Sequence, residues 1–144
     1  MNHGIIAKAA EIIKKKAGAG NEGYCGFASI DENGYPVVST ISVSKADGIK
    51  WLTFASSLES DRAKRVKKCS RASVCINSAE YHISLVGTAE IITDPQVKKE
   101  MWYDGLEYHF SGADDPDFSV LRFTTERYNI YFSDDDSFDA GVLS

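Results

Sequence analysis

The chain has 144 residues, of which 43% are hydrophobic and 26% charged, a composition that fits one globular domain and excludes disordered and fibrous proteins. Its formal net charge of −5 opposes the phosphate contacts that dominate nucleic-acid binding, so neither DNA nor RNA is expected as a partner. The apolar runs are far shorter than the roughly 20 residues that cross a bilayer, and the first residues do not form a secretory signal, which predicts a cytoplasmic protein without a membrane span.

The first predicted element is an amphipathic helix over residues 4–17. Apolar side chains recur there at helical spacing, and Gly18 and Gly20 follow as stop signals. The repeat comprises Ile5, Ile6, Ala9, Ile12 and Ile13. A helix with one apolar stripe is expected to lie on the core of the domain.

Three strands are predicted next, over residues 24–30, 36–44 and 49–55. The first two are separated by a segment that contains Asn33-Gly34, a strong hairpin signal because both residues tolerate positive φ. A second turn is predicted at residues 46–48, which include Gly48. The three strands are therefore expected to form an antiparallel meander.

The junction after the third strand has the composition of a phosphate site. The hydroxyl side chains of Ser56, Ser57 and Ser60 are followed at once by cations that begin a predicted helix over residues 60–68. Hydroxyls and the free N–H groups of a helix N-terminus can donate to phosphate oxygens, and Arg62 adds a guanidinium fork. The alternative interpretation is that Ser60 is only a helix N-cap and that the cations form a solvated helix face.

Strand character returns over residues 72–77 and 81–93, and Gly87 inside the second run indicates a bulge or a tight barrel corner. Asp94-Pro95 predicts a helix start that runs through residues 97–102, and a loop-like stretch follows over 104–117. A closing strand is predicted over 118–132 and an acidic tail over 134–144. About six strands, mostly joined by short turns, favour a mainly β domain over residues 1–144, with a small barrel at 24–132.

Several classes of site are not indicated by the sequence. The three cysteines contain no C-x-x-C pair and are interpreted as buried thiols in a reducing compartment. The three widely spaced histidines do not favour a metal centre, so no metal is predicted. Motifs of dinucleotide-binding, P-loop and α/β-hydrolase proteins are missing.

Five short motifs, in order, are typical of a known family. They are G-Y-P-V-V-S at 34–39, S-S-L-E-S-D-R-A at 56–63, S-L-V-G-T-A-E at 84–90, D-P-Q-V-K-K-E-M-W at 94–102 and D-D-P-D-F at 114–118. Together they resemble the pyridoxamine 5′-phosphate oxidase-like FMN-binding split β-barrels, and most of all the general stress protein 26-like branch. The resemblance covers roughly residues 24–132 and implies a six-stranded antiparallel split barrel with flanking helices.

The resemblance also implies a cofactor, FMN, in a cleft between the two subunits of a homodimer. The family binds the phosphate at the strand–helix junction, which here includes Ala55 and Ser57 and places Ser56, Ser60 and Arg62 as phosphate ligands. The second strand of such a barrel runs beside the flavin ring. This implies that Ser39, Thr40, Ile41 and Ser42 lie near the cofactor.

One position departs from the family pattern. Many relatives have an arginine three residues after the proline, where this chain has Ser39. Losing a charge-assisted contact to phosphate is expected to cost about 1.5–3 kcal/mol of cofactor binding unless another cation, such as Lys64 or Lys67, replaces it.

Histidine and aromatic residues supply further candidates. His82 occupies a position from which relatives reach the flavin with a glutamine, tyrosine or asparagine, so it is a candidate cofactor contact or, alternatively, a packed strand residue. The aromatic group Trp102, Tyr103, Tyr108 and Phe110 could stack on the flavin or serve packing and dimer contacts. His109 among them is equally open to either role.

The resemblance implies an FMN-dependent oxidoreductase with an unassigned small-molecule redox partner. No catalytic side chain is identified. Genuine pyridoxamine 5′-phosphate oxidase activity is not expected, because the C-terminal segment that holds the substrate phosphate in those oxidases has no counterpart. The alternatives are a module that binds a flavin, a deazaflavin or haem without turnover, and a dimeric interaction protein that has lost its ligand.

Overall fold

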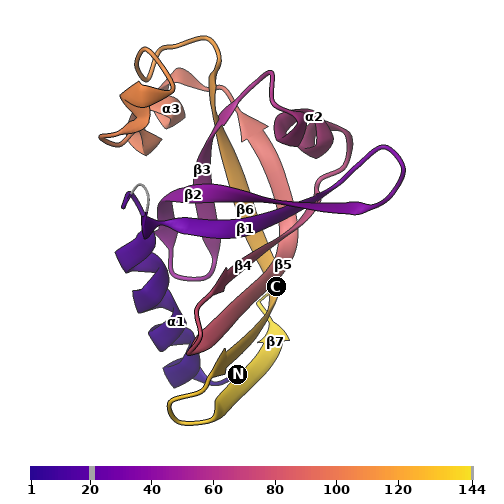
Figure 1. Ribbon diagram of the computed structural model, residues 1–144, viewed down its shortest axis with the longest axis vertical. Coiled ribbons are helices and arrows are strands. Elements are labelled where there is room, and N and C mark those ends of the chain that lie inside the picture. Colours follow the sequence, from indigo (N-terminus) through magenta and orange to yellow (C-terminus); the bar gives the residue numbers. More distant parts are fainter. Residues whose placement is uncertain (20–21, 144) are drawn as a thin grey trace.

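Seven strands form one antiparallel sheet in the part of the chain that the computed structural model describes, residues 1–19 and 22–143 (Figure 1). They are β1 (Tyr24–Ile30), β2 (Pro36–Asp47), β3 (Trp51–Ser57), β4 (Arg71–Asn77), β5 (Tyr81–Ile92), β6 (Phe118–Phe132) and β7 (Ser137–Val142). Their order is β3-β2-β1-β4-β5-β6-β7, and β3 also pairs with β6. This last pairing closes the first six strands into a barrel, as the sequence predicted, and leaves β7 outside it.

In the turn of the β1–β2 hairpin, only the glycine of the Asn33-Gly34 pair adopts a positive φ. The Asp31 N–H donates to the Tyr35 carbonyl at 2.9 Å, and the Gly34 N–H donates to the Asp31 carbonyl at 3.1 Å. Only Gly34 has a positive φ, of 85°, which makes this a type I turn followed by a left-handed residue. The predicted hairpin is confirmed, but Asn33 does not adopt the positive φ expected of it.

Gly87 marks the corner of the barrel that the sequence indicated. The β5–β6 register shifts between Val86 and Gly87, where Val86 pairs with Arg127 and Gly87 with Thr125. A Cβ atom on Gly87 would lie 1.9 Å from the backbone oxygen of Thr124. The two strands approach so closely here that only glycine fits.

Helix α1 (His3–Lys16) covers the barrel at the end where β7 lies (Figure 1). Asn2 caps it by accepting from the Ile5 N–H at 3.1 Å. Ile5, Ala9 and Ile13 are buried in the main core with the inward side chains of the strands. The spacing of these residues is the apolar stripe that predicted the helix.

The opposite end of the barrel carries α2 (Asp61–Lys68), α3 (Pro95–Met101) and a loop with one short 3₁₀ turn, η2 (Leu106–Tyr108) (Figure 1). A second apolar cluster anchors this loop on β6, and it contains Leu106, Phe110, Phe118 and Val120. The rings of Trp102 and Phe110 lie with their centroids 5.3 and 5.1 Å from that of Phe118. Both aromatic residues therefore pack, as one of the two interpretations required.

Two sequence interpretations are corrected. The segment interpreted as an acidic tail contains β7, which pairs with β6 from Arg127↔Val142 to Phe132↔Ser137. The thiols are not uniformly buried, because Cys25 is buried, Cys69 half-buried and Cys75 exposed. Cys75 lies on β4, where alternate side chains face outward. None of the helices in the described residues has the length and apolar character to cross a bilayer.

Candidate functional site

A cleft of about 520 Å³ lies at the end of the barrel that carries α2. It is lined by β2, by the end of β3, by the start of α2 and by the 103–117 loop. Eight of the ten predicted cofactor contacts line it, namely Thr40, Ile41, Ser42, Ala55, Ser56, Ser57, Ser60 and Arg62. The remaining lining residues are Tyr24, Tyr103, Leu106, His109, Phe110 and Asp117.

Ser39 does not line the cleft but holds the guanidinium that does. Its Oγ accepts from Nη2 of Arg62 at 2.8 Å and from Nε at 3.3 Å, and the Thr40 carbonyl accepts from Nη2 at 3.2 Å. Arg62 is half-buried, and burial, followed by the nearby charge of Arg65, lowers its pKa. None of these bonds uses Nη1. The residue that replaces the family arginine thus orients the remaining arginine.

Ser60 is the N-cap of α2. Its Oγ accepts from the Ala63 N–H at 3.1 Å and donates to the Ser57 carbonyl at 2.8 Å. The Ser56 Oγ lies 3.2 Å from it. The N–H groups of Asp61 and Arg62, at the first positions of α2, have no acceptor among the described residues. The helix start therefore presents backbone donors beside the Arg62 guanidinium.

The Ser57 hydroxyl binds the carboxylate of Asp117, which was not among the predicted site residues. Its Oγ lies 2.8 and 2.7 Å from the two carboxylate oxygens of Asp117, and the Leu58 N–H donates to the Asp117 carbonyl at 3.0 Å. Asp117 lines the cleft, so one carboxylate and one guanidinium are the formal charges of its wall. The D-D-P-D-F motif was the only sequence signal for this residue.

A buried lysine fixes the loop that carries Asp117. Lys98 is 7% exposed, and its ammonium donates to the Asp115 carbonyl at 2.9 Å. It lies 5.6 Å from the centroid of the Phe118 ring. The Asp115 carboxylate accepts from the N–H groups of Ser111 and Asp117, both at 2.9 Å, and these bonds lower its pKa. Lys98 and Asp115 together hold Asp117 in the cleft wall.

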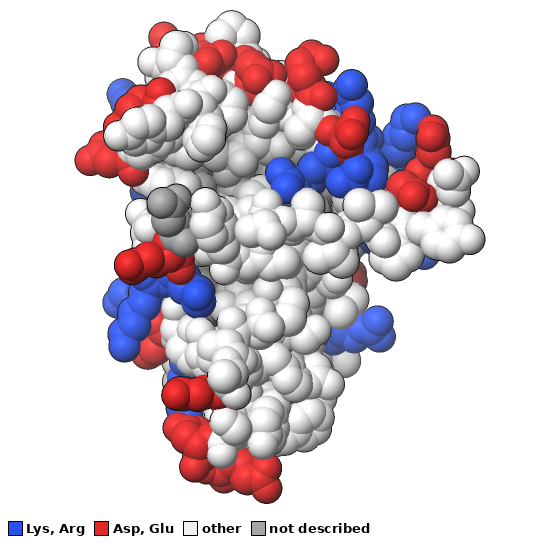
Figure 2. Space-filling view, in the orientation of Figure 1, with Lys and Arg blue, Asp and Glu red and all other residues white. Residues whose placement is uncertain are grey.

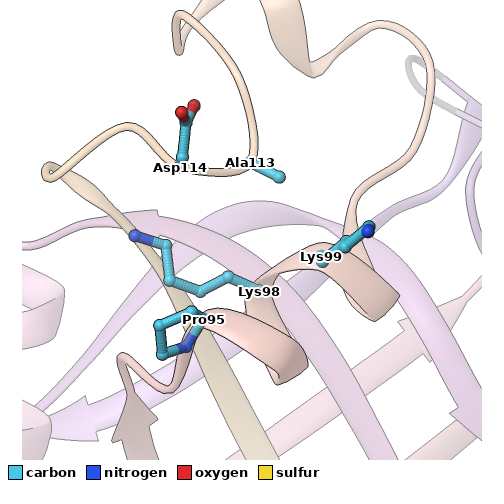
Figure 3. Close-up of a pocket in the computed structure, with 5 residues that line it drawn as sticks. All are labelled: Pro95, Lys98, Lys99, Ala113 and Asp114. Carbon is cyan, nitrogen blue, oxygen red and sulfur yellow. The ribbon is translucent and has the colours of Figure 1, made fainter.

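Figure 3 shows Lys98 from the side of a separate hollow of about 400 Å³. The Asp114 carboxylate points away from Lys98 in this view, and Lys99 lines another part of the hollow. The hollow shares no lining residue with the cleft, so it is not part of the same site.

His82, a predicted cofactor contact, and Lys64, a candidate replacement for the missing arginine, lie away from the cleft. His82 pairs with Asn77 and Tyr131 in the sheet, its Nε2 lies 3.2 Å from the Asn129 Oδ1, and its ring is 5.9 Å from that of Tyr131. Lys64 lines a different hollow, on the other side of α2, with Asp31, Glu32, Asp61, Arg65 and Lys68. Within one chain, neither reaches the lining of the cleft.

Comparison with known proteins identifies the fold family. The family model described as pyridoxamine 5′-phosphate oxidase matches residues 11–132. The chain belongs to this family. No curated protein matches the sequence significantly. The family resemblance and the split-barrel fold predicted from the sequence are confirmed.

Several solved structures are similar to almost the whole chain. A protein from Clostridium acetobutylicum, described as related to general stress protein 26 of B. subtilis, is 25% identical with a TM-score of 0.83, over 99% of this chain and 97% of that one. A pyridoxamine 5′-phosphate oxidase-related, FMN-binding protein from Nostoc punctiforme is 15% identical with a TM-score of 0.69, over 98% and 96%. A haem-binding protein from Mycobacterium smegmatis is 19% identical with a TM-score of 0.71, over 95% and 57%.

Proposed function

We propose that this chain binds FMN in the cleft and acts as a flavin-dependent oxidoreductase. The observation that carries the proposal is the arginine clamp, in which Ser39 and Thr40 hold the Arg62 guanidinium beside the start of α2. A preorganised arginine next to free backbone N–H groups suits a phosphate monoester. The volume of the cleft is within the range of small-molecule sites.

Each predicted contact has a distinct task in this proposal. Arg62 would bind the phosphate through Nη1, because Nε and Nη2 are already engaged. Ser56 and Ser60 would present hydroxyl oxygens at the junction, and Ser57 would keep its bond to Asp117. Ile41 and Ser42 on β2, with Ala55 on β3, would form the wall along the flavin ring.

The redox chemistry would come from the bound flavin, which accepts and donates electrons as a pair or singly. The contribution of the protein would be to hold the phosphate, to fix the orientation of the ring and to exclude water from one face. Leu106 and Phe110, which are buried, supply the apolar part of that wall. We assign no acid or base catalyst.

The same proposal includes a homodimer with the cleft at the subunit contact. Figure 2 shows a broad uncharged area over β1 and β2 in the middle of one face, beside the cations of α2. Tyr24, Tyr35 and Val38, from these strands and their turn, are 50%, 69% and 69% exposed. Exposed apolar side chains on an uncharged area favour contact with a second subunit, and that subunit could bring its His82 to the cofactor.

A second candidate function is a binding module without turnover. Two observations favour it: the cleft wall has a single guanidinium, and Asp117 places a carboxylate in the same wall. Both weaken the field for a phosphate dianion relative to a site with two arginines. A haem or a deazaflavin is the alternative ligand, and the former agrees with the haem-binding relative from M. smegmatis.

The proposal is tested by the absorbance spectrum of the purified protein before and after FMN is added, with titrations of Arg62→Ala and Lys64→Ala. We expect flavin bands and a 10- to 100-fold loss of affinity in Arg62→Ala, from the charge-assisted bonds removed. Lys64→Ala is the matched control on the other side of α2 and should bind as the original chain does. A protein that ignores FMN, or equal affinities, would refute the phosphate site.

Addition of NADH or NADPH then separates the two functions. Bleaching of the bound flavin supports the oxidoreductase, and an unchanged spectrum supports the binding module. A protein that also fails to bind haem or a deazaflavin would favour the third possibility, a dimeric interaction protein without a ligand.

A further inference from the structure

A second hollow of about 550 Å³ adjoins the cleft. The two share Tyr24, Ser42, Tyr103, Leu106 and His109, and the second adds Gly105 and Tyr108. We call this second hollow the aromatic lobe. Most of its lining comes from the 103–109 part of the loop, which is orange at the top of Figure 1. The aromatic residues of this loop were predicted as one group that stacks on the flavin or packs, and a second chamber was not predicted.

The aromatic lobe differs from the cleft in charge. Its lining residues include three tyrosines, one histidine and one serine but no lysine, arginine, aspartate or glutamate. The polar atoms it offers are hydroxyl and imidazole groups, which are donors or acceptors without formal charge at neutral pH when the imidazole is unprotonated. Burial, with Tyr24 close by, raises the pKa of Tyr103, so its hydroxyl remains a donor.

Hydrogen bonds and buried side chains fix the loop that forms the aromatic lobe. Gly105 adopts a φ of 111°, and its N–H donates to the Glu107 carboxylate at 2.9 Å. The N–H groups of His109 and Phe110 both donate to the Leu106 carbonyl at 2.9 Å. Leu106 and Phe110 are buried in the second apolar cluster, whereas Tyr108 between them is 87% exposed. The buried anchors thus hold an exposed aromatic rim over a chamber.

We infer that the aromatic lobe binds an uncharged planar aromatic molecule with carbonyl acceptors, of the quinone class. Tyrosine and histidine rings provide stacking surface, and the Tyr103 hydroxyl and the His109 imidazole provide donors for carbonyl oxygens. A phosphorylated or carboxylated substrate would find no cation in the lining. The inference names the redox partner of the proposed flavin site, so its functional meaning rests on the proposed function, but the binding itself does not require the flavin.

The test is calorimetric titration of the full chain, with and without FMN, with 2,3-dimethyl-1,4-naphthoquinone. Both reactive ring positions of this probe are blocked, so it cannot alkylate the cysteines. The matched anion is 2-hydroxy-3-methyl-1,4-naphthoquinone, which has nearly the same shape and is ionised at neutral pH. We expect the neutral quinone to bind at least tenfold more tightly than the anion.

The residues are tested with Tyr108→Ala and His109→Ala, and Tyr35→Ala is the matched control because Tyr35 is an exposed tyrosine on the β1–β2 turn. We expect each loop variant to weaken the neutral quinone at least fivefold, and we expect FMN affinity to stay unchanged in Tyr108→Ala, because Tyr108 lines the aromatic lobe but not the cleft. The inference would be overturned if both loop variants bound the neutral quinone as tightly as the original chain does. It would also be overturned if the original chain bound the anion as tightly as the neutral quinone. A monomer mass for Tyr108→Ala by light scattering, when the original chain has a dimer mass, would overturn it as well, because the lobe would then be a subunit contact.

The two proposals fail in distinguishable ways. If the protein takes up no FMN, the flavin site is refuted, and the titration of flavin-free protein still decides whether the lobe binds the quinone. If FMN binds and bleaches but no variant changes quinone affinity, the flavin site stands and the aromatic lobe is refuted.

Discussion

At the end of the barrel that carries α2, polar side chains bond to one another around a cleft, whereas at the α1 end apolar side chains close the core. The first end includes the pairs Arg62–Ser39, Ser57–Asp117 and Ser56–Ser60. At the second, Ile5, Ala9 and Ile13 are buried against the strands. Polar groups that are oriented by hydrogen bonds but remain accessible can still bind a ligand, whereas a buried apolar contact contributes mainly to stability.

Charged groups show the same contrast. At the α1 end, Lys8 lies 2.8 Å from the Asp134 carboxylate and 4.2 Å from the centroid of the Phe132 ring, and both charged side chains are well exposed. Such surface pairs contribute little to stability. At the α2 end, the half-buried Arg62 has hydroxyl and carbonyl partners but no carboxylate in direct contact among the described residues. We therefore expect changes at the two ends to separate ligand affinity from stability.

We expect the largest effect from Gly87→Ala, which should destabilise both ends of the barrel because both depend on the β5–β6 pairing. The new Cβ would lie 1.9 Å from a backbone oxygen, so the strands must separate. We expect a loss of more than about 3 kcal/mol, or no folded protein, in urea denaturation. Gly26→Ala is the control, because its Cβ would meet neighbours only at 3.5 Å and beyond. Similar stability of the two variants would contradict the prediction.

Ile13→Ala tests the α1 end alone. Ile13 is fully buried, so its truncation should cost about 2–5 kcal/mol of unfolding free energy through lost burial and a cavity. FMN affinity, measured by fluorescence titration under native conditions, should not change. Ile12→Ala, at a partly buried position of the same helix, should cost clearly less. A change in FMN affinity with Ile13→Ala would show that the ends are coupled.

Ser39→Ala tests the α2 end alone. Removing the hydroxyl releases Nε and one bond of Nη2, so the Arg62 guanidinium loses its fixed orientation. We expect about a tenfold loss of FMN affinity, which corresponds to about 1.4 kcal/mol, with the urea midpoint almost unchanged. Ser39→Thr retains the hydroxyl and should retain the affinity. If Ser39→Ala binds FMN normally, Arg62 does not need its anchor.

The smallest effect is a difference in thiol labelling that leaves the fold intact. Burial raises the pKa of the Cys25 thiol to about 12, burial also raises that of Cys75, and hydrogen bonds from Arg71 lower that of Cys69. Only the thiolate reacts, so iodoacetamide should label Cys69 first and Cys25 last as pH rises from 7 to 9. Mass spectrometry of timed samples measures the order. Early labelling of Cys25 would mean that β1, which carries this residue, separates from its neighbouring strands in solution.

Local patterns were sufficient for most strands and helices. The predicted ranges of β1 and β6 agree with the structure at both ends, because alternation and turn residues are encoded in neighbouring positions. Gly87 was recognised from a glycine inside a long strand run. By contrast, β7 was missed, because its apolar side chains Phe138 and Val142 are exposed, its less exposed positions carry serine, aspartate and glycine, and it is stabilised by pairing with β6 rather than by its own composition.

The sequence alone was enough to predict a type of site: hydroxyls, a helix start and an arginine in one short segment predict a phosphate pocket, since these groups are neighbours in the chain. Only the tertiary structure decided which residues act together. Ser39 and Arg62 are 23 residues apart, and Ser57 and Asp117 are 60 apart. Closure of the barrel by β3 and β6 brings the loop after α3 beside the β3–α2 junction, which creates the carboxylate wall and the aromatic lobe. Such contacts depend on long-range pairing, which no local pattern records.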